Sequence, residues 1–289
     1  DAAIVVWGEG TFGQNGYKTP ILNFYGHVTM NGSSAAITTN GTDMSNPVIN
    51  IYGGTVKSTS DVAIYVPSGT LKVSGGEIEG QTAIYFKSQS MTISGGTMSA
   101  IGTKTDYSYN GNGCNPTGDT VVIDDCDYPN GNGQVNITGG RFITADPDAE
   151  GIAVYIPESK TAGAGAKVLT DDDKATIAAL TNIKGGQVHF ATTEEAIKAN
   201  IYCADGYKLF AADNDFYQAF IAYHVSTSAI GEGTGKVIVS GSAYSVDTEN
   251  CSTGGFFKAN TDVTITAVPD EGSTVAAMTV GGVACAEET

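Results

Sequence analysis

The carboxylate side chains are the residues of this sequence best able to do chemistry, and Glu77 and Glu79 form its most suggestive pair. Hydrolysis of a glycoside needs two carboxyl groups that face each other across about 5 to 9.5 Å. Glu77 and Glu79 alternate on one predicted strand and share an outward face, which is also the pattern of two solvated carboxylates. The histidines, at positions 27, 189 and 224, form no pattern with a serine or cysteine nucleophile. The sequence therefore favours a non-catalytic protein without catalytic residues, and a polysaccharide lyase or glycoside hydrolase is the alternative.

Calcium is the one cofactor that the sequence leaves open. Asp124, Asp125 and Asp127 lie close together, but their spacing matches no known calcium loop and is typical of a solvated acidic turn. No two cysteines are spaced Cys-x-x-Cys, so a zinc site is not expected. A lyase acting on polyuronates would need cations around the substrate carboxylate, and the single arginine is Arg141. We expect no cofactor and no metal site.

Tyrosines at recurring positions suggest a ligand-binding face. Tyr65 and Tyr85 each end an Ala-Ile-Tyr phrase, and Tyr155 ends the similar phrase Ala-Val-Tyr. If the phrases stack, the three rings lie on one face, and aromatic rows of this kind suit sugar rings. The alternative is an ordinary stacking ladder that stabilises the fold. The only tryptophan, Trp7, is expected to plug the exposed end of the stack.

A repeated phrase positions these residues. The pattern apolar-x-apolar-x-Gly-Gly-x-apolar occurs at 49–56, 71–78 and 91–98, at intervals of 22 and 20 residues. Short strands of alternating apolar residues that end in glycine corners, with no helix between them, predict an all-β, right-handed parallel β-helix. The phrase returns at 135–142 and at 182–190, and the 44-residue interval before 139 predicts two coils.

The pattern divides the chain into three parts. Residues 1–190 are the predicted β-helix, with an inserted loop at 101–134 that is rich in Gly, Asn and Asp. Residues 191–228 are an aromatic cap, since an open solenoid end exposes core and unpaired backbone. In residues 229–289, apolar and polar residues alternate in short runs, and this pattern predicts a small β-sandwich-like domain. A short helix is expected at 170–180.

The five cysteines suggest an oxidising setting. Cys114 and Cys126 flank the inserted loop and are the best candidate disulfide, and a Cys251–Cys285 disulfide would stabilise the small C-terminal domain, whose core is marginal. Cys203 is expected to be a buried thiol.

Composition limits the partners. The formal net charge of −17 argues against nucleic acid and anionic polysaccharide. No apolar run is long enough to insert into a membrane. The start at Asp1, without Met or signal peptide, suggests a mature form of a longer precursor. We expect a secreted, extracellular protein.

The phrases also resemble known proteins. The Gly-Gly repeats, with the later strand Ala204-Asp205-Gly206-Tyr207-Lys208, resemble the pectate-lyase-like β-helix repeats of large surface proteins of Gram-positive gut bacteria. The stretch 259–272 resembles the divergent B-repeats of internalin-type surface proteins. The resemblance implies a bacterial cell-surface scaffold.

The function expected from these observations is structural. The chain would be a stalk or the subunit of a self-assembling filament, and its partners would be other copies of itself or surface glycans and proteins. Heterologous end-to-end contacts do not close and therefore form fibres. The opening strand Ile4, Val5, Val6 and Trp7 is a candidate assembly end. A carbohydrate-binding adhesin module is the alternative.

Overall fold

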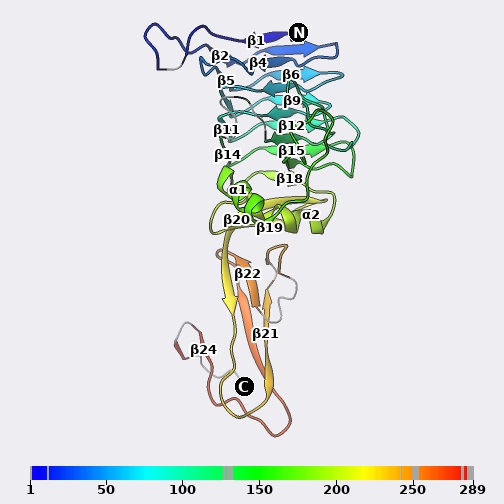
Figure 1. Cartoon of the computed structure of the whole chain (residues 1–289). Coiled ribbons are helices and arrows are strands. Elements are labelled where there is room, and N and C mark those ends of the chain that lie inside the picture. Colours follow the sequence, from blue (N-terminus) through cyan, green and yellow to red (C-terminus); the bar gives the residue numbers. More distant parts are fainter. Residues whose placement is uncertain are drawn as a thin grey trace.

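A computed structural model describes residues 2–11, 13–125, 128, 133–241, 243–248, 254–280 and 283–284. The described chain is dominated by short strands that build an elongated molecule (Figure 1). Its N-terminal two thirds is a stack of parallel strands, and its C-terminal third is a narrower set of long antiparallel strands.

Three parallel sheets, called A, B and C, make up the stack. From β2 onward the chain passes through them in the repeating order B, C, A. We call one such succession a coil. Sheet A contains β1 (Ile4–Val6), β4 (Ile37–Thr39), β7 (Ile64–Val66), β10 (Ile84–Phe86), β13 (Val121–Asp124) and β16 (Ile152–Tyr155). Sheet B contains β2 (Ile21–Phe24), β5 (Val48–Ile51), β8 (Thr70–Val73), β11 (Ser90–Ile93), β14 (Gln134–Ile137) and β17 (Thr181–Ile183). The parallel part of sheet C contains β3 (His27–Met30), β6 (Thr55–Ser58), β9 (Glu77–Gly80), β12 (Thr97–Ala100), β15 (Arg141–Thr144) and β18 (Gln187–His189).

The register between coils stacks apolar side chains in ladders that run along the molecule. In sheet A, Ile37, Ile64, Ile84, Val121 and Ile152 are partners in successive strands, and all are buried. Sheets B and C supply equivalent ladders, so one continuous core lies between the three sheets. The all-β, parallel and stacked architecture expected from the sequence is confirmed, and it is compatible with a β-helix.

The number of coils differs from the prediction. The strands β11 and β14 pair directly, as do β14 and β17, so each of the long intervals holds one coil and not two. The extra residues leave the stack as insertions. Residues 101–120, here called the covering segment, lie before β13, and residues 156–170 lie between β16 and α1 (Asp171–Leu180).

Glycine corners allow the close approach of successive coils. Gly54 has a φ of 80°, and a Cβ atom there would lie 1.8 Å from the backbone oxygen of Gly26 in the preceding coil. The neighbouring Gly53 has no atom within 4 Å of an added Cβ. The second glycine of the pair therefore supplies both the left-handed backbone and the space for stacking.

Helices and antiparallel strands cover the C-terminal end of the stack. The helix α1 begins with a capping box in which Thr170 and Asp173 exchange hydrogen bonds. The other covering elements are α2 (Thr193–Lys198), the 3-10 helix η1 (Ala199–Tyr202), β19 (Tyr207–Ala211) and β20 (Phe216–Ser226). The strand β20 pairs antiparallel with β18 and so extends sheet C beyond the last coil.

The separate C-terminal sandwich is not confirmed. The strand β22 (Gly254–Lys258) pairs with β20, so it continues the cap. A two-stranded ribbon forms between β21 (Gly235–Gly241) and β23 (Val263–Pro269), and β24 (Thr279–Val280) pairs with β25 (Val283–Ala284). The pairing of β20 with β22 therefore crosses the boundary that the sequence placed after residue 228.

The glycine pair gives a matched test of the stacking. We expect Gly54→Ala to lower the free energy of unfolding by at least about 1–2 kcal/mol, because alanine is strained in the left-handed region and its Cβ meets Gly26. Gly53→Ala should change it by less than about 0.5 kcal/mol. Denaturant unfolding followed by circular dichroism measures both, and equal effects would contradict this account of the corner.

Candidate functional site

The tyrosines predicted to bind a ligand lie beneath the covering segment. Tyr65 and Tyr85 are register partners in neighbouring coils, with their ring centroids 6.2 Å apart. The Tyr65 hydroxyl donates to the backbone oxygen of Gly113 at 3.0 Å. Tyr85 is fully buried, and its hydroxyl donates to Asp124. The predicted stacking is present, but protein atoms occupy the face where a sugar would lie.

Tyr155 does not continue that row. It stands opposite Asp124 in the register between β13 and β16, and Ala153 stands opposite Val122. Its ring stacks on Tyr107 of the covering segment, with centroids 4.7 Å apart and an interplanar angle of 19°. The three tyrosines therefore form no open ligand face, because the covering segment folds back over sheet A.

A buried ion pair lies at the centre of this covered face. The Lys87 ammonium is 3.0 Å from Oδ2 of Asp124, and both side chains are fully buried. Asp124 accepts hydrogen bonds from Tyr85 at 3.0 Å and from Tyr107 at 2.7 Å. Lys87 also donates to the backbone oxygens of Asn110 and Gly113. The pair therefore joins two coils of sheet A to the covering segment.

A second polar network ties the start of the covering segment to the last coils. Both oxygens of Asp119 accept from Lys104, at 2.6 and 2.8 Å. The hydroxyls of Thr117 and Tyr155 each donate to Asp119 at 2.6 Å. The backbone amide of Glu150 donates to it at 2.7 Å. Asp119 is thus a fully engaged structural carboxylate.

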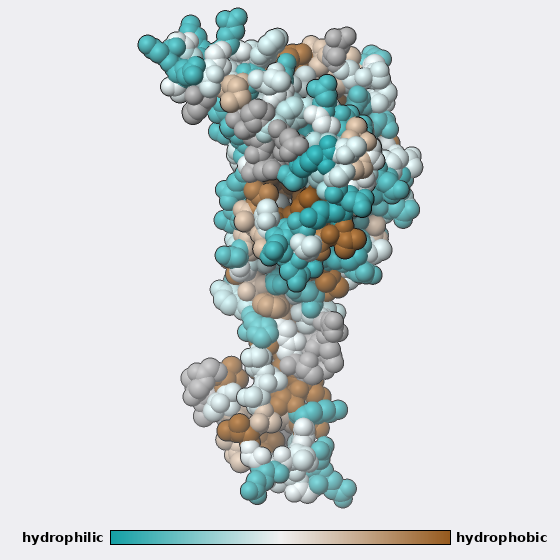
Figure 2. Space-filling view, in the orientation of Figure 1, coloured by the Kyte–Doolittle hydropathy of each residue, from teal (hydrophilic) through white to brown (hydrophobic). Residues whose placement is uncertain are grey.

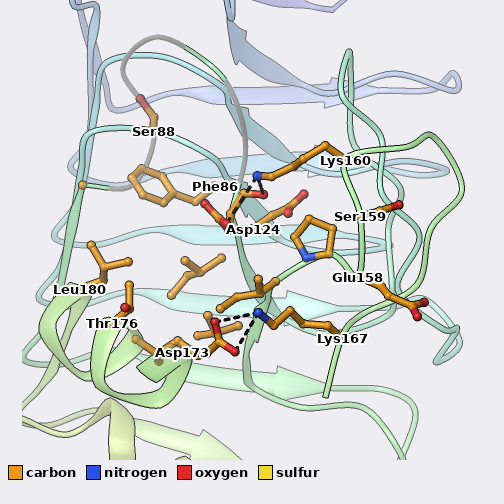
Figure 3. A pocket seen from close by; sticks show the side chains of 17 residues that line it. Phe86, Ser88, Asp124, Glu158, Ser159, Lys160, Lys167, Asp173, Thr176 and Leu180 are labelled. Carbon is orange, nitrogen blue, oxygen red and sulfur yellow. Dashed lines mark hydrogen bonds and ion pairs between the residues drawn. The ribbon is translucent and has the colours of Figure 1, made fainter. Parts of the chain in front are cut away.

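Two clefts open beside the covered face, and the first lies between α1, β13 and the insertion 156–170. Its volume is about 520 Å³. Figure 3 shows Phe86 and Leu180 on its apolar floor and Lys160 and Lys167 on its rim. The lysines form ion pairs with Asp125, at 3.5 Å, and with Asp173, at 2.9 Å. Figure 2 shows apolar surface at the level of α1, within a largely hydrophilic face.

The second cleft, of about 550 Å³, lies between β16 and α2 and contains Glu150. Burial raises the pKa of Glu150 to about 7, and the nearby charge of Asp119 adds to the rise. A carboxyl group of this kind can donate or accept a proton near neutral pH. The oxygens of the neighbouring Asp119 are engaged by Lys104, Thr117 and Tyr155.

The other acidic candidates have structural surroundings. Glu79 forms an ion pair with Lys57, and both of these side chains are about a third exposed, so the Glu79 carboxylate is solvated. Asp124 is held by Lys87, and Asp127 lies outside the described residues. Among the residues that the structure describes, no three His, Cys, Asp or Glu side chains are arranged to hold a metal ion.

The described residues contain no disulfide. Cys114 is a free thiol whose pKa burial raises above its usual range, and its predicted partner Cys126 lies outside the described residues, as do Cys251 and Cys285. Cys203 is a half-buried thiol at the core, and burial raises its pKa to about 12. The two predicted pairings thus gain no support.

The N-terminal end of the stack is open, unlike the C-terminal end. Among the residues that the structure describes, the strands β1, β2 and β3 each pair with one neighbour only. The exposed apolar side chains there are Val5 (51%), Trp7 (65%), Ile21 (59%) and Tyr25 (67%). Trp7 is exposed and does not form the predicted plug, while Tyr25 stacks on Tyr52.

Sequence reasoning missed the residues that organise the covered face. Lys87 follows directly after the buried strand β10, and Asp124 ends the buried strand β13. Charged residues that continue an apolar run were a signal for buried pairing. Glu150 gave no such signal, because its burial depends on the packing of α2.

Glu150 provides a test of the second cleft. Its raised folded-state pKa means that the folded protein loses stability relative to the unfolded chain as the pH rises from about 4.5 to about 7. Glu150→Gln removes this loss. We expect the variant to unfold like the wild type at pH 4 and to be more stable by about 1–2 kcal/mol at pH 8, after allowance for solvent screening. Equal unfolding free energies at pH 8 would contradict the burial of this carboxyl.

Comparison with protein families, with characterised proteins and with solved structures finds no match to this chain. No helix in the described ranges is long and apolar enough to cross a membrane. The functional assignment therefore depends on the geometry of the chain itself.

Proposed function

We propose that this protein is an extracellular structural rod that joins other copies of itself end to end. In this proposal the stacked sheets form a right-handed parallel β-helix, the hand strongly preferred when parallel strands of one sheet are joined by a crossover. The observation that carries the proposal is the contrast between the ends. The C-terminal end is covered by α1, α2, β19 and β20, and at the other end the first strands of the three stacked sheets have an edge that no described strand pairs with.

The backbone of β1 is suited to strand addition. The amide of Ile4 donates to the backbone oxygen of Ala36, directly before β4, and alternate residues of a parallel strand bond to opposite neighbours. The amide and carbonyl groups of Val5 therefore face the open side. Natural proteins commonly protect such edges with charged residues or proline. The strands β1, β2 and β3 contain no Lys, Arg, Asp, Glu or Pro.

The C-terminal ribbon is the partner surface that we assign. The strands β21 and β23 pair with each other, and the other edge of each meets no strand among the described residues. Figure 2 shows brown, apolar surface over this part of the molecule. Ile230, Val268 and Val280 are exposed apolar side chains of the C-terminal part of the chain. Contact between the ribbon of one copy and the open coil of the next is heterologous and does not close, so it builds a fibre.

The net charge and the repeated phrases of the chain are consistent with this role. A net charge of −17 keeps a secreted surface soluble and disfavours nucleic-acid partners. The Gly-Gly phrases resemble the repeats of bacterial surface scaffolds, and the proposal places this chain among extracellular proteins of that kind. The tyrosine face, which would have favoured a glycan adhesin, is covered by the segment 101–120.

Substitution of Val5 tests the proposal. Val5→Pro removes the amide that an added strand would use and leaves the hydrogen bond of Ile4 to β4 in place, since proline is tolerated on edge strands. We expect the wild type to form elongated assemblies, detected by light scattering and electron microscopy. Val5→Pro should remain monomeric, with an unchanged circular dichroism spectrum.

Val5→Thr is the matched control, because threonine keeps the amide and the β-branched shape. It should assemble like the wild type. A wild type that is monomeric at high concentration, or a Val5→Pro variant that assembles normally, would show that the open coil is not a joint.

A further inference from the structure

The Lys87–Asp124 pair has surroundings that are unusual for an ion pair. Both side chains are fully buried, and they lie between sheet A and the covering segment. The nitrogen and Oδ2 are 3.0 Å apart. The adjoining side chains include Tyr85 and Tyr107, and the partly buried thiol of Cys114 packs against the cluster that contains Tyr85.

Burial acts on the carboxyl group of this pair. Removal of the carboxylate from water raises the pKa of Asp124, although Lys87 and the two tyrosines oppose the rise. Transfer of one proton from the ammonium to the carboxylate leaves an amine beside a carboxylic acid, with no net change in charge. A neutral pair costs less to keep out of water than an ion pair. An amine is a nucleophile and an ammonium is not.

We propose that Lys87 and Asp124 condense to form an intramolecular isopeptide bond. The Nζ atom attacks Cγ of Asp124, a C–N bond forms, and one C–O bond breaks. Of the three ammonium protons, two leave with the departing oxygen as water and one remains on the amide nitrogen. The reaction needs no oxidant, reductant or second substrate, because both reacting groups are held by the fold.

The neighbouring groups have defined roles in this step. Tyr107 donates to Oδ1 at 2.7 Å and Tyr85 donates to Oδ2 at 3.0 Å, so they polarise the carboxyl group and stabilise the negative charge that develops on its oxygen. The carbonyl oxygens of Asn110 and Gly113 accept from Nζ at 2.7 and 2.9 Å and hold the nitrogen beside Asp124. These contacts make Tyr107 and Tyr85 catalytic residues of the condensation.

The bond would lock the fold where the repeat is interrupted. Lys87 follows β10 and Asp124 ends β13, and these two strands are neighbours in sheet A although the covering segment separates them in sequence. A covalent link between them keeps the covering segment closed over the tyrosines. It also makes the rod resistant to mechanical stretching, a property useful to a fibre subunit. The bond itself does not depend on fibre formation.

Intact mass spectrometry of the folded wild-type chain tests the proposal. We expect a mass lower by one water than the sequence requires, and a branched peptide that joins Lys87 to Asp124 after proteolysis. A chain of full mass after prolonged incubation under folding conditions would overturn the proposal. A loss of water that maps to any other position would overturn it as well.

Two comparisons sharpen the result. Lys87→Arg keeps a cation but cannot form this amide, so it should retain its full mass. The Lys104–Asp119 pair is the internal control: its nitrogen and oxygen are 2.6 Å apart, but the Lys104 side chain is 28% exposed and therefore remains in contact with water. Peptides that contain this pair should be unlinked. Linkage of Lys104 to Asp119 to the same extent would contradict burial as the cause.

Tyr107→Phe tests the assigned chemistry. Loss of one donor to a developing oxyanion slows a reaction by about 100-fold or more. We expect the time course of water loss to slow by at least about tenfold in this variant, with its circular dichroism spectrum unchanged. An unchanged rate would overturn the role of Tyr107.

Discussion

Hydrogen bonding between one coil and the next is the interaction on which this structure depends. Each strand of the stack has three or four residues, too few for a stable sheet on its own, and its ladder partners belong to the coils before and after it. The same register stacks Ile, Val, Leu and Met side chains into the shared core. Stability is therefore a sum of coil-to-coil contacts, and each end of the stack is a separate structural problem.

The two ends solve this problem differently. At the C-terminal end the chain turns back, so that β20 pairs antiparallel with the last parallel strand and helices cover the core. At the other end the edges of β1, β2 and β3 meet no strand of the described chain. An apolar, uncharged edge of this kind is a template for another strand. The tendency of an unpaired strand edge to pair with another strand thus explains both the cap and the proposed joint.

The local sequence pattern predicted the stacked fold well, because alternating apolar residues and glycine corners recur once in each coil. The strands at 49–56, 71–78 and 91–98, the helix at 170–180 and the cap were all predicted from it. The pattern could not show that residues 101–120 fold back onto Tyr65 and Tyr85, since that contact joins distant segments through single hydrogen bonds. It also could not predict the shift of Tyr155 by two positions in the register.

The candidate site was predictable only in part for the same reason. The inserted loop at 101–134 was predicted, and it contains Lys104, Asp119 and Asp124 of the two polar networks. Their partners, Asp124 and Asp119, follow from the path of the covering segment and not from any spacing in the sequence. Glu150 likewise depends on α2, which closes the second cleft from the far side.

The central claim is that the open coil pairs with another copy, and amide hydrogen exchange tests it most directly. The measurement compares exchange in β1, β2 and β3 at low and high protein concentration. The account predicts that the amide of Val5, which faces the open side, exchanges rapidly in dilute solution and becomes protected as the concentration rises. Rapid exchange of this amide at every concentration would contradict it.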